Sequence, residues 1–410
     1  MKLFIFILLP ALLFSDDLKS LLEFAQKNNN LINASKIVET SKKSELSATK
    51  HSYYPTLDAN AFYERDDKPT PFYPGTTYGV SAKISYSIYD GGKKAYITKQ
   101  KKDELLASEF KTKASKKDIL LVITKNFFNL KSLYASLDAT QEASKAVKAQ
   151  LTRIKQFYVA NLATSDDVDR LQSAYDRTIY TIESLKFKIF SLKKLLELEV
   201  GKKIISLDNS KFQKSKMTDD DNLDAIKALT KDKNALTNQT KMIDSYYHPN
   251  IKIEDSYTIF GYQDKPYFAS QPIPLLDTQN KIMATLSLRI FDFGALSEKK
   301  EALRLKVDAM NEKISYKIKE QNMEREIALR RIKTTKLNIH STKSALKSAT
   351  SALKTITKKY QNGIVEHVTY LDALSSRTEA YALYQKSLND LEIAYALYYY
   401  YNAKNLEDYL

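Results

Sequence analysis

The sequence contains no cysteine and only four histidines. Without cysteine there is no disulfide, no thiolate metal site, no cysteine nucleophile and no lipid anchor on a mature N-terminal cysteine. No two histidines stand at the spacing of metal ligands on one helix; they are His51, His248, His340 and His367. These absences exclude several of the catalytic and metal-binding classes that are easiest to recognise, and no cofactor is expected.

Glycine and proline are scarce and unevenly placed. The chain has 8 glycines and 9 prolines in 410 residues. After Pro10, every proline lies in 55–74 or 249–274, and the glycines lie in 75–92 and 261–294, except for Gly201 and Gly363. Because both residue types interrupt helices, the chain is expected to form helix-rich blocks around two windows of other structure.

The N-terminus has the pattern of a secretory signal peptide, which we expect to span residues 1–15. Lys2 precedes an apolar run, and Ser15 stands before Asp16 and Asp17. The run is shorter than the ~20 residues that a transmembrane helix needs. No later apolar run is long enough either. If the protein crosses a membrane, strands must do so.

Each window contains a segment with strand periodicity. In Tyr78–Asp90, apolar Val80, Ala82, Ile84, Tyr86 and Ile88 alternate with serine and lysine, and the turn Asp90-Gly91-Gly92 follows. A second segment alternates Ile282, Ala284, Leu286, Leu288 and Ile290 with polar residues and ends at Asp292-Phe293-Gly294. Alternation with a period of two predicts strands with one apolar and one polar face.

Long stretches without glycine or proline follow both strand windows. They predict two helices of about 100 Å at 1.5 Å per residue, over about 93–160 and 296–361. A first helix is expected from Asp17 to about His51, and return helices are expected at 166–200 and 367–405. The same 202-residue offset separates Asp90 from Asp292 and Tyr158 from Tyr360. We therefore predict a duplication, with a first repeat at 16–206 (hairpin 57–90) and a second at 207–410 (hairpin 250–292).

The strands need partners from other copies of the chain. Membrane barrels begin at about 8 strands and cannot leave open edges in lipid, so the predicted four strands are too few. The apolar face is expected to contact lipid through Val80, Ile84, Ile88, Leu286, Leu288 and Ile290. An aromatic girdle is expected at the strand ends nearest the helices, from Tyr53, Tyr54, Tyr86, Tyr89, Tyr246, Tyr247, Phe291 and Phe293. A second aromatic group, at the loop ends, comprises Phe72, Tyr73, Tyr78, Tyr267 and Phe268.

The order of these motifs resembles the TolC family of outer-membrane efflux proteins. The resemblance covers nearly all of 17–405 and is carried by YPTLDA before a strand, YSIYDGG and RIFDFG after strands, and the tips YVANLATSDDVDRLQSAYD and YQNGIVEHVTYLDAL. It implies a mainly α fold with a small β part: a duplicated helix–β-hairpin–long helix–helix unit. Three such chains would form a twelve-stranded outer-membrane β-barrel continued by a periplasmic α-helical barrel.

The resemblance also implies a function and partners. The expected role is the outer-membrane exit duct of a tripartite efflux pump or a type I secretion system. The expected partners are two further copies of the chain (a homotrimer), outer-membrane lipid, a periplasmic adaptor (membrane fusion) protein, and an inner-membrane RND pump or ABC transporter. The expected location is the outer membrane, with an extension into the periplasm.

Site residues follow from the motifs at the two tips. Asn161, Leu162, Gly363 and Ile364 fall where the family's tips carry a small and an aliphatic residue, the region that meets the adaptor. Gly363 matches the family's usual glycine and Asn161 departs from it, but asparagine tolerates left-handed backbone, so the turn is expected to survive. The alternative for these residues is turn chemistry alone. Asp167 and Asp372 fall where the family often carries acids at the periplasmic constriction, with Tyr360 as a neighbouring partner. Thr369 stands where a second acid is common. For Asp167, an alternative is that its carboxylate complements the dipole of the first turn of its helix.

Other function classes have weaker support. No nucleophile with a base in reach can be named, so an enzyme is not expected. The Asp219–Asp221 run is better explained as a helix start after Thr218 than as a metal site, and His367 is expected to be an exposed tip residue. The net charge of +15 fits solvated helix faces, because no nucleic-acid-binding fold is recognisable. The alternative to a duct is a secreted coiled-coil adhesin or structural surface protein, in which strands would be incidental.

Overall fold

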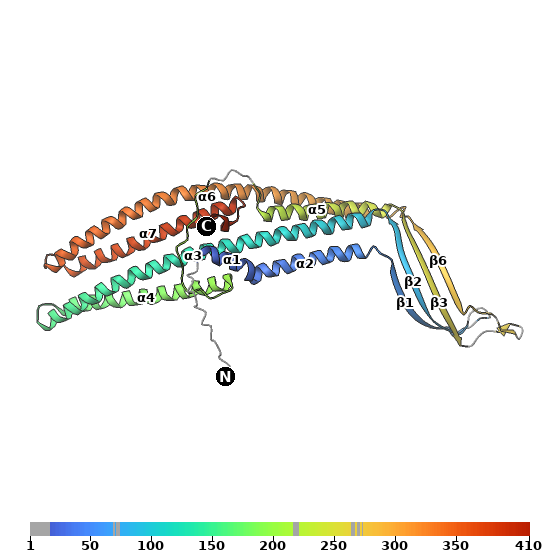
Figure 1. The fold of residues 1–410 in the computed structure, drawn as a ribbon, viewed down its shortest axis with the longest axis horizontal. Coiled ribbons are helices and arrows are strands. Elements are labelled where there is room, and N and C mark those ends of the chain that lie inside the picture. The colour runs from blue at the N-terminus through green and yellow to red at the C-terminus, as the bar shows by residue number, and fades with distance from the viewer. Residues whose placement is uncertain are drawn as a thin grey trace, which may run out of the picture. The chain divides into compact units, whose positions relative to one another are not determined.

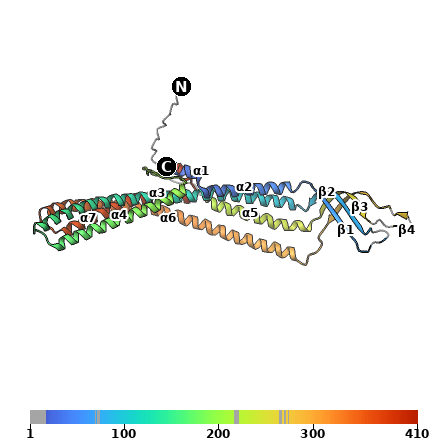
Figure 2. The same cartoon turned by 90° about the horizontal axis from the view of Figure 1, so that it is seen from below.

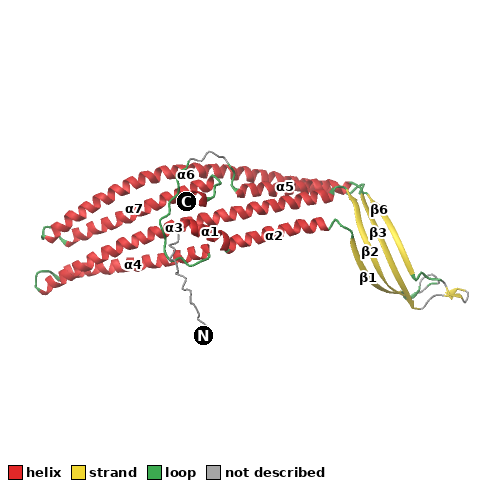
Figure 3. Ribbon diagram, viewed as in Figure 1, coloured by secondary structure: helices red, strands yellow, loops and turns green. Residues whose placement is uncertain are grey.

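The computed structural model describes residues 17–68, 70, 74–215, 221–263, 267–268, 271–272 and 274–410. The predicted signal peptide lies outside these residues, as do Phe72 and Tyr73 of the second aromatic group. The described part consists mostly of helices with one small region of sheet (Figure 3). The predicted fold class, mainly α with a small β part, is therefore confirmed.

The helices follow the duplicated order. The long helices α3 and α6 each contain 67 residues. Gly91 and Gly92 precede α3 with positive φ, and Gly294 precedes α6 in the same way, so the turn signals do mark the helix starts. The bounds are α1 Leu18–Asn28, α2 Asn30–His51, α3 Lys93–Val159, α4 Ser165–Val200, α5 Asp224–Asp244, α6 Ala295–Gln361 and α7 His367–Tyr401, with short 3₁₀ helices η1 Ser245–Tyr247 and η2 Leu406–Tyr409.

The strands form a four-stranded antiparallel sheet in the order β1-β2-β3-β6. β1 and β6 lie at its two edges (Figure 1). The bounds are β1 Thr56–Arg65, β2 Thr76–Asp90, β3 Asn250–Gln263 and β6 Thr278–Ser287, and a separate pair of short strands, β4 Tyr267–Phe268 and β5 Gln271–Pro272, lies between β3 and β6 in the chain. The central pair, β2 and β3, joins the two repeats.

The chain divides into two compact units, and each unit draws on both repeats. One unit comprises 36–111 and 225–316 and contains the sheet; the other comprises residues up to 35 together with 112–224 and 317–410. In the second of these, α4 lies beside the later half of α3, and α7 lies beside the later half of α6 (Figures 1 and 2). This unit therefore contains both helical hairpin tips.

The main core of the tip-containing unit lies beside α1. Fully buried Leu18, Leu21 and Leu22 of α1 pack in one cluster with Phe127 and Leu196. Ile123, Phe127 and Leu130 of α3, spaced four and three residues apart, belong to this core, whereas Tyr134 is 40% exposed. Burying each such side chain contributes about 1.5–3 kcal/mol. Tyr399 of α7 is also fully buried and stacks on Tyr409, with ring centroids 4.3 Å apart.

The helix predicted for 17–51 is divided at Asn29, which corrects that prediction. The Asn29 side-chain oxygen accepts hydrogen bonds from the backbone nitrogens of Leu31 (2.8 Å) and Ile32 (3.1 Å), so it caps the start of α2. Its side-chain nitrogen donates to the carbonyl of Glu199, in the last turn of α4. The end of α4 therefore meets the junction of α1 and α2.

The start of α5 also differs from the prediction. The helix was expected to begin after Thr218, but it begins at Asp224. Residues 216–220 lie outside the described residues. Asp221 and Leu223 are held by α6 instead: the Gln321 side chain donates to the Asp221 carbonyl (3.0 Å) and accepts from the Leu223 backbone nitrogen (3.1 Å). This contact replaces the first helical turn that the acidic run suggested.

Within the described ranges, none of the helices combines the length and the apolar character that crossing a membrane would require.

Candidate functional site

The sheet has one apolar and one polar face, and the register shows which residues share each. One row across the four strands contains Leu57, Ile84, Asp255 and Ile282, and the next contains Asp58, Lys83, Ser256 and Lys281. Val80, Ile84 and Leu286 lie on the apolar face and are 54%, 48% and 69% exposed. The alternation in the sequence thus predicted both faces correctly for these residues.

The predicted end of the second strand needs correction. β6 ends at Ser287 rather than Asp292, so Leu288 and Ile290 lie beyond it in an irregular segment. The reason is the length of its neighbour: Ser287 pairs with Asn250, the first residue of β3, and Pro249 precedes it. Among the described residues, β6 has no strand partner beyond Ser287. In β2, Ile88 is the extra residue of a bulge between Ser87 and Tyr89.

The polar face carries a compact charged cluster. The Glu254 carboxylate accepts from the Nζ atoms of Lys83 (2.6 Å) and Lys252 (2.8 Å) and from the Ser85 hydroxyl (3.2 Å). Its side chain is only 11% exposed. Two lysines around one carboxylate leave a net positive charge. The composition of this face, with lysine, glutamate, serine and threonine, suits contact with water.

Asp255 is an exception on the apolar face. Its direct cross-strand neighbours are Ile84 and Ile282, and its Oδ1 atom is buried without a hydrogen-bond partner among the described residues. The alternation Ile251, Ile253, Asp255, Tyr257, Ile259 in β3 is the signal that would have shown this carboxylate on the apolar face. A carboxylate among apolar side chains is costly unless a cation or proton compensates it.

Aromatic and basic residues gather where the sheet joins the helices. The Lys94 ammonium lies over the rings of Tyr53 (5.3 Å) and Tyr86 (5.4 Å), and the Tyr53 hydroxyl donates to the Lys94 carbonyl. Lys93 lies 4.7 Å from the centroid of Tyr246. The remaining predicted girdle residues at this end are Tyr54, Tyr89, Tyr247, Phe291 and Phe293, of which Phe293 is 91% exposed.

The two helical tips share one backbone conformation. Asn161 and Gly363 both have positive φ, 56° and 72°. Leu162 N–H donates to the Phe157 carbonyl, as Ile364 N–H does to that of Lys359. These i to i−5 bonds with a left-handed residue form the turn that commonly ends a helix. Asparagine tolerates this conformation, so the prediction that the first tip keeps its turn without glycine is confirmed.

Asp167 caps the start of its own helix, α4, at the first tip. Its carboxylate accepts from the hydroxyl and backbone nitrogen of Thr164, while the Thr164 hydroxyl accepts from the Asp167 backbone nitrogen at 3.2 Å. This is a capping box. Hydrogen bonds from the Thr164 side chain and backbone hold the pKa of Asp167 below its usual value. The helix-start role considered for Asp167 is therefore present in the structure.

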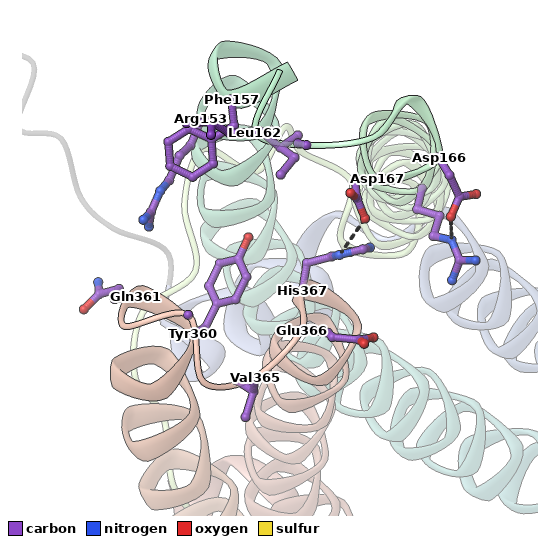
Figure 4. A pocket seen from close by; sticks show the side chains of 14 residues that line it. Arg153, Phe157, Leu162, Asp166, Asp167, Tyr360, Gln361, Val365, Glu366 and His367 are labelled. Atoms are coloured by element: carbon purple, nitrogen blue, oxygen red, sulfur yellow. Dashed lines mark ion pairs between the residues drawn. The ribbon is translucent and has the colours of Figure 1, made fainter. Parts of the chain in front are cut away.

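At the second tip, the start of α7 approaches a residue of the first tip. Glu366 is the N-cap of α7 but makes no capping hydrogen bond. The next residue, His367, was predicted to be exposed, yet its side chain is only 10% exposed, and its Nδ1 atom lies 3.6 Å from Oδ1 of Asp167 (Figure 4). Its Nε2 atom is buried without a hydrogen-bond partner in the described structure. Sequence reasoning missed this contact because Asp167 belongs to the other repeat.

The predicted gate residues line two neighbouring hollows. Asp167 and Tyr360 line a pocket of about 530 Å³ between the tips (Figure 4). Tyr360 stacks on Tyr370 with centroids 5.2 Å apart, and burial raises the pKa of Tyr360. Asp372 is exposed and lines a second groove of about 800 Å³ together with Arg170 and Arg177. His367 lines both hollows.

Comparisons with known proteins agree with this architecture. The sequence model of the outer membrane efflux protein family matches residues 21–179. A comparison with curated proteins finds no match. Among solved structures, the chain is similar to the CmeC outer membrane channel of Campylobacter jejuni, with a TM-score of 0.80 and 15% identity over 95% of this chain and 86% of that one.

Two further structures are equally similar in fold. The outer membrane protein VceC of Vibrio cholerae has a TM-score of 0.77 and 14% identity, with 95% of this chain and 96% of that one covered. A membrane protein from Pseudomonas aeruginosa has a TM-score of 0.79 and 18% identity over 94% and 93%. These findings support the expected outer-membrane location with a periplasmic extension. The predicted resemblance is confirmed: residues 21–179 carry the sequence of the outer membrane efflux protein family, and the chain as a whole has the fold of the TolC-like outer-membrane channels.

Proposed function

We propose that three copies of the chain form an exit duct through the outer membrane and the periplasm. The observation that carries this proposal is the four-stranded sheet with one apolar face, one charged face and two unpaired edges. Three such sheets would supply twelve strands, which is enough to close a barrel with lipid outside and water inside. The aromatic and basic residues at the helix end of the sheet suit the membrane–water interface.

The duct would serve a tripartite efflux pump or a type I secretion system. In this proposal, a periplasmic adaptor joins it to an inner-membrane RND pump or ABC transporter. Support comes from the tips, where Leu162 is 74% exposed and Ile364 is 67% exposed on identical turns. Two exposed aliphatic side chains in equivalent positions suit a partner that contacts both repeats alike.

The periplasmic end would be narrowed by residues near the tips. Asp372 faces a groove, and Asp167 with Tyr360 lines the adjoining pocket. In a trimer each of these residues occurs three times, and converging carboxylates attract cations. Asp167 is already used in the capping box and lies beside His367. Asp372 has no hydrogen bond or ion pair to the described residues, so it is the stronger candidate for the constriction.

Assembly and conductance test the duct directly. We expect the full chain to fractionate with outer membranes, to be a trimer in detergent, and to form conducting channels in planar lipid bilayers. A well-folded monomer in detergent that forms no channels would contradict the proposal. A secreted adhesin would appear outside the membrane fraction and would not conduct.

The adaptor contact can be tested by site-specific photo-crosslinking in cells. A photoreactive residue at Leu162 or Ile364 should crosslink to a periplasmic protein, which mass spectrometry then identifies. Tyr180, which is 74% exposed on α4 away from the tip, provides the control position. Crosslinks only to other copies of the chain would contradict the proposed adaptor contact.

The gate is tested by single-channel recording. Asp372→Asn should change the resting conductance of the trimer or weaken its block by divalent cations applied from the periplasmic side. Glu379→Gln is the matched control, because Glu379 lines the same groove on the same helix two turns further on. Wild-type conductance and block in an intact Asp372→Asn trimer would place the constriction elsewhere.

A further inference from the structure

The two edges of the sheet present backbone groups without strand partners. β1 lies at one edge and β6 at the other (Figure 1). In the proposed trimer, which this inference assumes, β6 of one copy lies next to β1 of the following copy. The residues that face each other across this junction can be deduced, because the chain contains an internal example of the same junction.

The two hairpins have identical internal registers. Thr56 pairs with Ser85 in the first, and Asn250 pairs with Ser287 in the second. At the far end, Arg65 pairs with Thr76 as Ile259 pairs with Thr278. Thus β1 corresponds to β3 and β2 corresponds to β6, residue by residue. The β2–β3 junction inside the chain is therefore equivalent to a β6–β1 junction between chains.

We propose that β6 pairs with β1 of the next copy in the register that β2 uses with β3. Ser85 pairs with Glu254 and Ala82 with Tyr257. The equivalent pairs between copies are Ser287 with Asn60 and Ala284 with Tyr63. The alanine–tyrosine pair thus recurs at the same place in both junctions. Asp90 pairs with Asn250, so by the same rule the pairing between copies extends to Asp292 opposite Thr56.

Charge complementarity supports this register. In this register Arg289 lies opposite Asp58, as Ser87 lies opposite Lys252 in the internal junction. Lys281 lies opposite Asp66, as Gly79 lies opposite Phe260. None of these four charged side chains has an ion-pair partner among the described residues. Asp58 and Lys281 both lie on the polar face. Opposite charges directly across a strand pair are stabilising, and like charges are not.

The apolar face gives the same result. Leu288 and Phe291, which follow β6, are 53% and 70% exposed, and Leu57 of β1 is 73% exposed. The proposed register sets Leu288 opposite Ala59 and Phe291 opposite Leu57. It thus gives strand partners to the segment that a single chain leaves unpaired, and it places these apolar side chains against one another.

Disulfide trapping tests the register, and the natural chain has no cysteine to interfere. In the Asn60→Cys/Ser287→Cys double variant, the two Cα atoms would lie about 5 Å apart between copies, within disulfide range. Within one chain they are separated by two intervening strands, or about 14 Å at 4.8 Å per strand. Mild oxidation should therefore give a covalent trimer on a non-reducing denaturing gel.

A shifted pair provides the control. In Phe62→Cys/Ser287→Cys the first cysteine lies two residues, about 7 Å, further along the strand, so crosslinking should be at least tenfold weaker. Equal or stronger crosslinking of this pair overturns the register. If the detergent-solubilised protein is trimeric but neither pair crosslinks, the register is overturned while the duct proposal stands. A protein that is monomeric in detergent overturns both.

Charge reversal tests the Arg289–Asp58 pair independently. Arg289→Asp and Asp58→Arg should each lower the temperature at which the trimer dissociates in detergent, and the double variant should recover most of the loss. A double variant that is no more stable than the weaker single variant would show that these side chains do not face each other.

Discussion

The two helical tips have the same backbone turn but hold it with different side chains. In the first, Asn161 occupies the left-handed position and Thr164 and Asp167 form a capping box. In the second, Gly363 occupies that position, and the Glu366 side chain makes no capping hydrogen bond. The second tip receives its contact from Asp167 of the first, through His367. The two repeats thus share the turn, whereas the side-chain capping bonds are present only at the first of the two tips.

The apolar faces of the two hairpins differ in a similar way. Ile84 and Leu286 are equivalent positions and lie opposite Leu57 and Ile251 within their hairpins, but Ile84 also lies opposite Asp255 of β3. The residue of β1 equivalent to Asp255 is Ala61, so the second hairpin has a carboxylate on its apolar face where the first has an alanine. Each prediction below compares a position in one repeat with the corresponding part of the other.

The largest effect is expected for a cation on the apolar face. Leu286→Lys should destabilise the assembled protein by about 2–4 kcal/mol, if that position lies near the bilayer midplane. Ile84→Lys should cost clearly less, because the new ammonium lies opposite the Asp255 carboxylate. Denaturant unfolding in lipid vesicles measures both, with Ser287→Lys on the polar face as the control. Equal losses for Leu286→Lys and Ser287→Lys would show that the two faces are not distinguished by lipid.

A moderate effect is expected from branched residues at the tip turns. Gly363→Val should lose about 1–2 kcal/mol or more, because valine disfavours positive φ, and export by cells should fall. Gly363→Asn copies the first tip and should retain both stability and export. Thermal unfolding of the trimer and a transport assay measure the two effects. If Gly363→Asn is as damaging as Gly363→Val, the side chain at this position matters more than the backbone.

A smaller effect is expected at the helix caps. Thr164→Ala removes a capping hydrogen bond and should cost about 0.5–2 kcal/mol. Glu366→Ala at the equivalent position should cost much less, because Glu366 makes no such bond. Limited proteolysis at the two tips would compare them: cleavage near Thr164 should accelerate in the first variant. If both tips resist cleavage equally in both variants, the prediction that only the first tip depends on a side-chain cap is wrong.

The smallest effect concerns pH. The folded-state pKa of Asp167 is lowered, chiefly by the Thr164 side chain. Its contribution to stability is therefore complete above the unfolded pKa of about 3.9 and is lost as the pH falls through the lower folded value. Proteolysis of the first tip by an acid-active protease should thus increase below about pH 4, beyond the increase at the second tip. Asp167→Asn, which cannot titrate, should abolish the pH dependence of this difference.

Most of the sheet could be predicted from the sequence, because the alternation that identifies a strand and its two faces lies within the strand itself. Alternation identified the faces of β2 and most of β6, and Asp90-Gly91-Gly92 marked the start of α3. The strand end at Ser287 could not be read in this way, because it depends on where β3 begins. The alternation continues to Ile290, which is the pattern expected if these residues pair only with a second copy.

The tips were predicted in part. The left-handed turn at Asn161 and the helix-start role of Asp167 depend on neighbours within a few residues, and the sequence contained both. The burial of His367 depends on the approach of the other hairpin, which no local pattern encodes. The break at Asn29 was missed because apolar residues continue past it, although three consecutive asparagines, Asn28 to Asn30, were an available signal of a helix boundary.

One residue, Asn29, holds the ends of three helices. Its backbone N–H donates to Ala25 at the end of α1, its amide oxygen caps α2, and its amide nitrogen donates to Glu199 in the last turn of α4. Because each end depends on the position of this residue, opening one end removes a partner from the other two. The three ends should therefore open as one cooperative unit. Their amide hydrogens are expected to exchange with solvent with a common free energy of opening.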